Sequence, residues 1–331
     1  MSDNSVQYVD GIPIPAMFPA DKFRSALTYK PNPNDLFLVT YPKCGTTWTS
    51  LILLLLFQKG EQLKDMDLEK SPFLEMAGAK TIENMSKPGI IKSHLPFHLI
   101  PWSKDAKYIY VARNPKDCCV SYFLYSKHMP GNNCEETFDQ FFEHFMTGLP
   151  ETVYFGDYFD HVLSWYSQRN NPNVLFVTYE ELKEDIDAAI LKMASFIDDE
   201  KYAQPIRENP EILENIKQYS SVKAAKEFVT KQSEVKAKMN VEELANSSGH
   251  NTIKEHLVVE NDSLKPAVSD KRSGPNVNSS ERFKLMRELV RKGVIGDWKN
   301  YFSEDQSRRI DEKFEKMAKG TDLSHFFTKY M

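Results

Sequence analysis

The chain has 331 residues, of which 41% are hydrophobic and 27% charged, and its formal net charge at pH 7 is −5. This composition is ordinary for a globular protein, and the length permits one large α/β domain with a sizeable core. The acidic balance argues against a general nucleic-acid surface but is compatible with a local basic pocket for one polyanionic ligand.

Targeting and metal signals are lacking in the sequence. The N-terminal residues show no basic segment followed by an apolar one, and the longest apolar run, Leu51 to Phe57, is too short to span a bilayer. The cysteines have neither a C-x-x-C pair nor metal-ligand spacing; they are Cys44, Cys118, Cys119 and Cys134. We therefore expect a cytoplasmic protein with reduced thiols, no metal, and no nucleic-acid or membrane partner.

Residues 1–34 are rich in proline and predict an N-terminal arm that lies extended over a domain formed by residues 35–331. Strands are predicted at 36–40, 89–92, 108–112 and 174–179. Helices are predicted at 46–58, 115–126, 137–146 and 159–168. This alternation predicts a single α/β domain with a central, mostly parallel sheet flanked by helices on both faces. Ligands of such sheets bind at the carboxyl ends of the strands, where each motif described below begins.

The composition changes between Ala224 and Arg291, where Lys, Glu, Asn and Ser dominate. The stretch from Ser263 to Ser280 contains two prolines and little apolar content. We expect a flexible region at about 224–290, with helices at Glu234–Leu244 and Ser280–Lys292.

A phosphate site is predicted at Thr40-Tyr41-Pro42-Lys43-Cys44-Gly45-Thr46-Thr47-Trp48, which lies between an apolar strand and the apolar run of a helix. Free backbone N–H groups at a helix N-terminus attract an anion, and Lys43 adds a full positive charge. The pattern G-x-x-x-x-G-K-[ST] is absent, so this is not an ordinary ATP site.

This segment resembles the PAPS-binding loop T-Y-P-K-S-G-T-T-W of the cytosolic sulfotransferases, with Cys44 in place of Ser. Three further blocks are similar to motifs of that family and occur in the family's order: Lys92-Ser93-His94-Leu95-Pro96, Arg113 to Tyr122, and Arg291 to Phe302. A chance match of four ordered motifs is improbable. The resemblance implies a P-loop-like strand–loop–helix for PAPS (3′-phosphoadenosine 5′-phosphosulfate). It also implies sulfuryl transfer to a hydroxyl of a small acceptor, with PAP as the nucleotide product.

Sulfuryl transfer needs in-line positioning, cations around the developing charge, and a base for the hydroxyl proton. By resemblance, His94 is the base, Lys43 neutralises the leaving phosphate oxygen, and Lys92 reaches the sulfonyl oxygens. Residues i and i+2 of a strand share one face, so Lys92 and His94 can point into one site.

The resemblance also assigns the rest of the cofactor site. The predicted 3′-phosphate residues are Arg113, Ser121, Arg291, Lys292 and Gly293. The predicted 5′-phosphate and adenine residues are Thr46, Thr47, Trp48 and Tyr179, together with Cys44, Gly45 and Ser220. Val222 stands where the family has an aromatic residue against adenine, so either cofactor affinity is weaker or Trp48 carries more of the stacking.

Two other departures from the family concern the surface. The region at 224–290 is about forty residues longer than the corresponding connection of the family, a length that a surface loop tolerates. The family's dimer segment K-x-x-x-T-V-x-x-x-E has Ser303 and Glu304 for Thr-Val, and Arg308 for the final Glu. We therefore expect a monomer, or a dimer through another surface.

An aromatic acceptor pocket is predicted from the segments that resemble the family's acceptor-lining regions. Its residues are Phe18, Phe23, Phe97, Phe142, Met146, Tyr154 and Phe155. Glu151 is predicted at the pocket mouth, where a carboxylate favours a protonated amine. The expected acceptor is a small phenol or phenolic monoamine; alternatively, Glu151 faces solvent and pocket shape alone sets selectivity.

Two other functions are alternatives to the hypothesis of sulfuryl transfer. A nucleotide kinase shares the strand–loop–helix but needs a Walker loop, which is absent. A non-catalytic protein that binds PAPS or a hydrophobic ligand is the other alternative, and the presence of both Lys43 and His94 argues against it.

Overall fold

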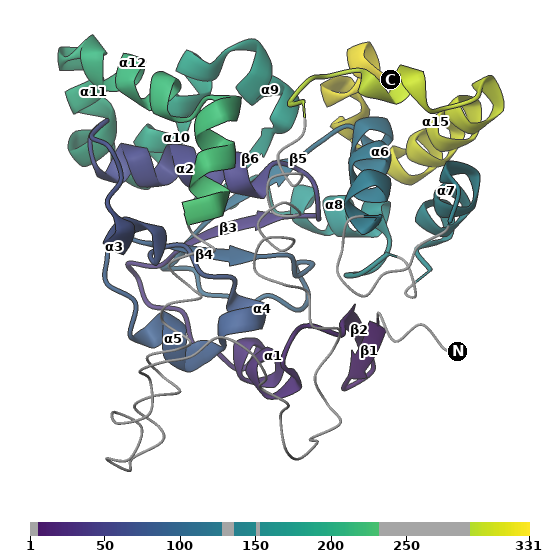
Figure 1. The fold of residues 1–331 in the computed structure, drawn as a ribbon, viewed down its shortest axis with the longest axis horizontal. Helices are drawn as coiled ribbons and strands as arrows, with labels where there is room; N and C mark the ends of the chain where they lie inside the picture. The colour runs from purple at the N-terminus through teal and green to yellow at the C-terminus, as the bar shows by residue number, and fades with distance from the viewer. Residues whose placement is uncertain (1–5, 128–135, 150–152, 232–291) are drawn as a thin grey trace, which may run out of the picture.

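The computed structural model describes residues 6–127, 136–149, 153–231 and 292–331, drawn in colour in Figure 1. Its centre is a four-stranded parallel sheet in the order β4-β3-β5-β6. The strands are β3 (Leu36–Thr40), β4 (Ile90–Ser93), β5 (Lys107–Ala112) and β6 (Val174–Thr178). The predicted fold class is confirmed, and the four strands begin and end within one residue of the predicted bounds.

The sheet separates two hydrophobic cores, because alternate side chains of a strand point to opposite faces. Phe37 and Tyr108 belong to one core, whereas Leu38 and Ile109 belong to the other. All four side chains are buried, so the strands read as continuous apolar runs, as expected for a parallel sheet covered on both faces.

Helices cover each face (Figure 1). The Leu38 face packs against α2 (Thr46–Phe57), α9 (Tyr179–Glu184), α10 (Ile186–Asp198), α11 (Gln204–Glu208) and α12 (Pro210–Tyr219). The Phe37 face packs against α1 (Ala20–Leu27), α4 (Leu74–Ala77), α5 (Ala79–Glu83), α6 (Pro115–Ser126), α7 (Phe138–Thr147), α8 (Tyr158–Tyr166) and α15 (Glu304–Ala318). Shorter elements are α3 (Asp65–Leu68), a π-helix at Asp199–Ala203, and 3₁₀ turns at Asp297–Asn300, Leu323–Phe326 and Thr328–Tyr330.

Helix α2 follows the phosphate-loop motif and is apolar on every side. The residues from Leu51 to Leu56 are all buried, which fits a helix enclosed between the sheet and α12. Gly45, the residue before this helix, has φ +101°, a left-handed conformation that glycine adopts without strain. The strand–loop–helix predicted from the sequence is therefore present.

The N-terminal arm differs from the extended segment that was predicted. Strands β1 (Val6–Val9) and β2 (Ile12–Pro15) form an antiparallel hairpin, and α1 follows. Asp10 and Gly11 both have positive φ, as a two-residue hairpin turn of the Asp-Gly type requires. Ile14 and Phe23 are fully buried in the core, so the arm is an integral part of the fold.

The region at 224–290 is described only up to residue 231, and the helices predicted at Glu234–Leu244 and Ser280–Lys292 lie outside the described residues apart from Lys292 itself. The domain boundaries and the insertion stay predictions.

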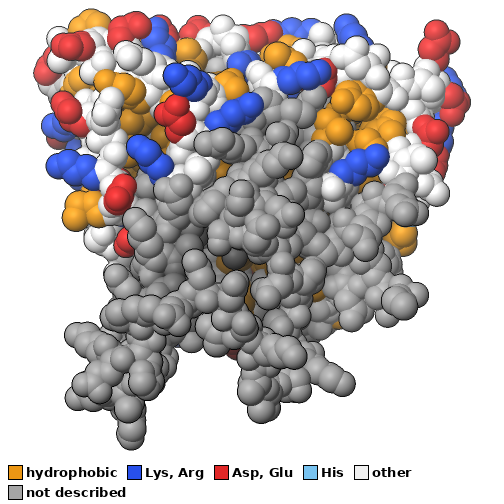
Figure 2. Space-filling model, viewed as in Figure 1, with side chains coloured by type: hydrophobic (Ala, Val, Ile, Leu, Met, Phe, Trp, Pro, Cys, Tyr) orange, Lys and Arg blue, Asp and Glu red, His pale blue; other side chains and the backbone are white. Residues whose placement is uncertain are grey.

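In the described ranges, no helix combines the length and apolarity needed to cross a membrane. Acidic and basic side chains are interspersed over the upper helices of the face in Figure 2.

Candidate active site

The candidate site lies at the carboxyl edge of the sheet, where four motif segments converge. The register pairs Val39 with Ser93 and Thr40 with Val111, and Ala112 with Thr178. The phosphate loop, His94, Arg113 and Tyr179 directly follow the four strands and are therefore brought to one edge. This is the place where open parallel sheets bind ligands.

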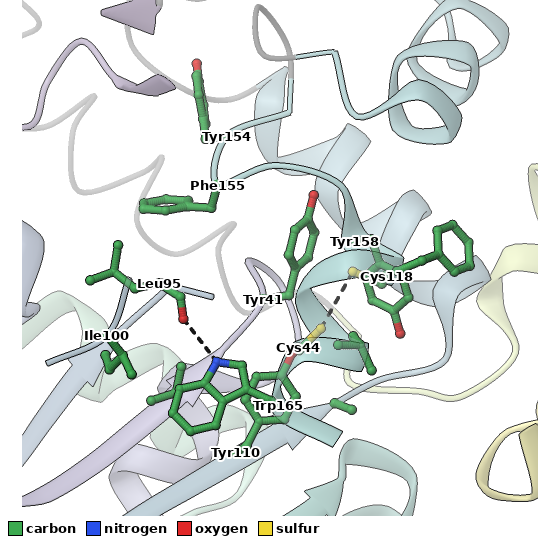
Figure 3. Close-up of a cluster of buried hydrophobic side chains, with 14 of the residues drawn as sticks. Tyr41, Cys44, Leu95, Ile100, Tyr110, Cys118, Tyr154, Phe155, Tyr158 and Trp165 are labelled. Carbon is green, nitrogen blue, oxygen red and sulfur yellow. Dashed lines mark hydrogen bonds between the residues drawn. The ribbon is translucent and has the colours of Figure 1, made fainter. Parts of the chain in front are cut away.

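Steric contact with Tyr179 requires glycine at position 45 of the phosphate loop. A Cβ atom on Gly45 would lie 2.9 Å from Cδ2 of Tyr179, closer than real Cβ contacts. Lys43 also has a positive φ, 70°, and its Nζ lies 4.5 Å from the ring centroid of Tyr125. Cys44 is fully buried, with its Sγ 3.7 Å from that of Cys118, so it faces the core beneath the loop (Figure 3).

Arg113 links the phosphate loop to the end of β5. Its Nη1 donates to the carbonyl oxygen of Lys43 at 3.3 Å, and its guanidinium lies 4.5 Å from the ring centroid of Tyr179. The side chain is buried, and its Nε has no hydrogen-bond partner within the described part of the chain. A buried N–H without a partner is costly, so an anion that accepts from it would be stabilised here.

The predicted adenine residues also meet. Trp48 and Tyr179 pack edge to face with centroids 5.5 Å apart, and Trp48 Nε1 donates to the carbonyl oxygen of Ser220 at 2.9 Å. Lys183, which was not predicted, has its Nζ 5.2 Å from the Trp48 ring centroid. Burial and the charge of Arg113 lower the pKa of Lys183. The sequence could have indicated Lys183 by its position four residues after Tyr179, which places the two on the same helix face.

Gly293 closes the same region from the C-terminal segment. It has φ +65°, and a Cβ there would lie 3.1 Å from Val222 Cγ2 and 3.6 Å from Tyr179 Oη. Val222 and Tyr179 therefore both lie beside Gly293, and the adenine role of this region stays a prediction. Lys292 pairs with Asp297 at 3.0 Å, whereas Arg291 lies outside the described residues.

The remaining predicted cofactor residues lie on the two helices that follow β3 and β5. Thr46 Oγ1 is 2.6 Å from Thr40 Oγ1, so Thr46 ties the start of α2 to the end of β3. Thr47 is half-buried on α2, and Ser121 is half-buried on α6.

Two residues of the Arg113 motif have a structural role that the sequence did not reveal. Asp117 accepts from the backbone N–H groups of Gly296 (2.7 Å) and Trp298 (3.0 Å). Lys116 is buried and donates to Ser307 Oγ at 2.8 Å. These contacts dock the C-terminal segment that carries Lys292 and Gly293.

His94 follows β4 and has a defined tautomer. Its Nδ1 lies 2.8 Å from the carbonyl oxygen of Thr40, which can only accept, so Nδ1 carries the proton and Nε2 is the acceptor. Burial lowers the pKa of His94 to about 4, and the charges of Lys92 and Lys43 act in the same direction. The half-buried imidazole is therefore neutral near pH 7.

Aromatic rings flank His94. The ring centroids of Phe73 and Phe155 lie 4.9 Å and 5.4 Å from that of His94. The backbone of Phe155 has a positive φ of 68°. Phe18 is 6.0 Å from Phe155. Phe73 was missed because nothing in its local sequence distinguishes it from a core residue. Lys92, which is buried, lies with its Nζ 4.7 Å from the Phe73 centroid.

Other predicted acceptor residues contact different parts of the core. Phe97 packs against Trp102 and Trp165. Phe142 is fully buried and contacts Phe302 and Arg309.

Three acceptor predictions remain. The backbone carbonyl of Met146 accepts from Lys313 Nζ at 2.6 Å, which ties the end of α7 to α15. Tyr154 is buried in the cluster of Figure 3, and its backbone N–H donates to Tyr122 Oη at 2.9 Å. Glu151 lies outside the described residues.

The segment compared with the family's dimer contact lies at the start of α15. Glu304 is exposed, and Arg308 pairs with Asp305 and Glu312. A groove of about 580 Å³ runs along this segment and contains no predicted site residue. The oligomeric state stays a prediction.

A parallel sheet whose strand ends carry a phosphate loop, a buried arginine and a neutral histidine is suited to group transfer from a nucleotide. Comparison with known proteins specifies the class. The family model for the sulfotransferase domain matches residues 33–271 and 241–322. Sulfotransferase 1E1 of Bos taurus is 31% identical over 331 residues, covering 96% of this chain and 94% of the relative.

Sulfotransferase 1 family member D1 of Mus musculus is also 31% identical, covering 95% and 93% of the two chains. The crystal structure of mouse sulfotransferase SULT7A1 complexed with PAP superposes with a TM-score of 0.70 and 26% identity, covering 99% of this chain and all of that one. The chain therefore belongs to the sulfotransferase family and is an enzyme that uses PAPS as its sulfuryl donor.

The residues at the strand ends fit the phosphates of such a donor. The buried Nε–H of Arg113 has no partner among the residues that the structure describes, and Lys43 and Lys183 add two cations nearby. Gly45 opens a twelve-residue helix whose N-terminus favours an anion.

Proposed function

We propose that this enzyme transfers the sulfuryl group of PAPS to the hydroxyl of a small phenol, including phenolic monoamines, with His94 as the general base. The observation that carries the proposal is the hydrogen bond from His94 Nδ1 to the carbonyl oxygen of Thr40. It leaves Nε2 as the proton acceptor of a neutral imidazole beside two lysines.

The nucleotide would be held by Lys43, Arg113 and Lys183 at its phosphates and by Trp48 and Tyr179 at its adenine. When bound, PAPS supplies an activated sulfuryl group with a nucleotide phosphate as leaving group. Lys43 follows β3 in the phosphate loop, where its charge would offset the charge that develops on departure. Arg113 would fix the 3′-phosphate through charge-assisted hydrogen bonds.

His94 would accept the hydroxyl proton at Nε2. Its pKa of about 4 keeps the imidazole neutral well below pH 7, so the base is present before the acceptor arrives. The bond to Thr40 holds the ring orientation and the tautomer. Lys92, which lies two residues earlier, would place its charge on the sulfonyl side.

The rings around His94 support the proposed acceptor class. Phe73, Phe155 and Phe18 offer apolar faces beside the base, and aromatic rings stack well on such faces. We expect flat phenols to be preferred over steroids. The preference for an amine over a carboxylate rests on Glu151, which the sequence places near these segments.

Transfer of radiolabelled sulfate from PAPS to four acceptors tests the proposal: a simple phenol, a phenolic amine, its carboxylate analogue and a steroid. Labelled product should form fastest with the first two. Glu151→Gln should reduce the ratio of kcat/KM between amine and carboxylate and leave the simple phenol unchanged. An enzyme that binds PAP but labels no hydroxyl would overturn the catalytic assignment, and equal ratios in both proteins would remove Glu151 from it.

A further inference from the structure

Two buried glutamates have the same arrangement at the ends of neighbouring motifs. Glu75 Oε1 accepts from Ser93 Oγ at 2.7 Å and from the backbone N–H of His94 at 2.6 Å. Glu180 Oε1 accepts from the backbone N–H and the Nδ2 of Asn114 at 3.0 and 2.8 Å. Both glutamates are fully buried, and the Oε2 of each has no partner in the described ranges.

The position of Glu75 is set by pairing along the outer side of β4. The backbone N–H of Ile90 donates to Lys70 O at 2.7 Å, and that of Lys92 donates to Pro72 O at 2.9 Å. Phe73 forms a parallel bridge with Lys92, and α4 begins at the next residue. The chain that runs beside β4 thus carries the Glu75 carboxylate to the end of that strand.

The opposite side of the same backbone is held by α8. His161 Nε2 donates to the carbonyl oxygen of His94 at 2.9 Å, and its Nδ1 accepts from the Tyr110 hydroxyl at 2.8 Å. Trp165 Nε1 donates to the carbonyl oxygen of Leu95 at 3.1 Å (Figure 3). The peptide groups around His94 are therefore fixed from both sides, which leaves the imidazole directed at Thr40.

Glu180 acts on the residue after Arg113. Asn114 is the N-cap of α6, where its side chain accepts from the backbone N–H of Asp117. The carbonyl group of Arg113 accepts from the Tyr158 hydroxyl. Glu180 and Tyr158 thereby hold the two ends of the same peptide group, the one that links Arg113 to Asn114.

We propose that Glu75 and Glu180 are positioning residues for separate parts of the reaction: Glu75 fixes His94 and its Nδ1–H tautomer, and Glu180 fixes Arg113 against the cofactor. This inference rests on the roles proposed above for His94 and Arg113. Loss of Glu75 is therefore expected to lower kcat, whereas loss of Glu180 is expected to weaken cofactor binding.

The cost of burying these groups supports a positioning role. Burying a carboxyl group is costly unless its oxygens are paired, and here one oxygen of each accepts two hydrogen bonds while the other has no partner among the described residues. The charge of Arg113 offsets part of this cost at Glu180. Burial raises the pKa of Glu75 to about 7, and burial also raises the pKa of Glu180. A protonated carboxyl retains an accepting C=O oxygen, so the contact is available in either protonation state.

Paired substitutions separate acceptor geometry from charge. Glu75→Gln and Glu180→Gln keep the accepting oxygen, whereas Glu75→Ala and Glu180→Ala remove it. Glu75→Asp, which withdraws the oxygen by one methylene, serves as a second variant should the Ala protein fail to fold. Thermal unfolding of each variant reports its folding, and nitrogen chemical shifts of His94, assigned with His94→Asn, report the tautomer without substrate.

Glu75→Ala or Glu75→Asp should lower kcat by about tenfold to a hundredfold, since small misplacements of a reacting group cost that much. The same variants should mix the His94 tautomers and leave the Kd of PAP within about twofold, because no cofactor contact is lost. Glu180→Ala should weaken PAP binding by about tenfold, the effect of one charged hydrogen bond, with an unchanged His94 tautomer. Both Gln variants should stay within about threefold of wild type.

The inference is overturned if Glu75→Ala or Glu75→Asp leaves kcat and the tautomer unchanged, or if both glutamates shift kcat and PAP affinity in the same proportion. Gln variants as impaired as the Ala variants would also contradict it, because charge rather than geometry would then be responsible. Full activity of His94→Ala would instead sink the proposed function itself. The tautomer shifts would still report on Glu75 in that case.

Discussion

The cofactor side and the acceptor side of this site are held in different ways. On the cofactor side, the phosphate loop, Arg113 and Tyr179 each directly follow a strand of one parallel sheet, so backbone pairing fixes their spacing. On the acceptor side, Phe155 comes from a connection outside the sheet and has a positive φ, whereas Phe73 forms only an isolated bridge with Lys92 beside β4. The cofactor side is thus part of the scaffold, whereas the acceptor side can change without altering the sheet.

This difference means that substitutions on the two sides should have separable kinetic effects. A change at a strand end should alter the rate or the nucleotide affinity, and a change among the rings should alter the KM of the acceptor. Loss of that separation would show that the two sides are coupled.

The largest effect among the following variants is expected for Lys43→Ala on the cofactor side. Its charge is needed most as the leaving group departs, so kcat should fall by about a hundredfold or more while the KM of PAPS rises less. Initial rates over a range of PAPS concentrations measure both parameters. A rise in KM that exceeds the fall in kcat would show that Lys43 serves binding rather than departure of the nucleotide.

Arg113→Ala should mainly weaken nucleotide binding, by about tenfold to a hundredfold for PAP, because charged hydrogen bonds are lost. Calorimetric titration with PAP and with its analogue lacking the 3′-phosphate isolates the contribution of that group. The affinity ratio of the two nucleotides should shrink in the variant. The same ratio as in wild type would mean that Arg113 does not contact the 3′-phosphate.

His161 ties the backbone after β4 to Tyr110 of β5 and should make the stability of the fold depend on pH. Burial lowers its pKa from 6.5 to about 3, so between these values the unfolded chain binds a proton that the folded chain does not. Stability from this group is complete above pH 6.5 and is lost as the pH falls towards 3. His161→Gln should reduce the slope of the unfolding free energy against pH by about 1.4 kcal/mol per pH unit between pH 4 and 6.

Urea unfolding at several pH values measures this slope. Gln keeps a donor for the His94 carbonyl and an acceptor for the Tyr110 hydroxyl, so it serves as a matched variant. Identical slopes in the two proteins would show that His161 is protonated in the folded state.

The smallest effect is expected for Phe155→Ala on the acceptor side. Loss of one ring contact should raise the KM of a phenol by about threefold to tenfold and leave the Kd of PAP unchanged. Rates with a varied phenol at saturating PAPS, together with PAP titration, test the separation. A parallel loss of PAP affinity would contradict the division into two sides.

The sequence predicted the parallel sheet well, because strands buried on both faces appear in the sequence as continuous apolar runs. It also indicated His94, Arg113 and Tyr179, because each lies in a motif at a strand end. Glu75 could not be found in this way, since its role depends on contacts between distant segments. The Asp10-Gly11 hairpin had a local signal that the proline content obscured.

Acceptor residues were the least predictable part of the site. Phe142 and Phe155 are both aromatic residues near the same connection, yet one packs against Phe302 and the other lies beside His94. Hydrophobicity alone does not tell a core ring from a pocket ring, because both are buried. Their separation depends on the path of the connection, which tertiary packing determines.

The central claim is that His94 is the base of a sulfuryl transfer whose nucleotide site is independent of it. Turnover of a phenol and the Kd of PAP, measured together for His94→Ala, test this claim most directly. We predict that turnover falls by about a hundredfold or more while the Kd of PAP stays within about twofold of wild type. Turnover within a few-fold of wild type, or a loss of PAP affinity that matches the loss of rate, would contradict the account.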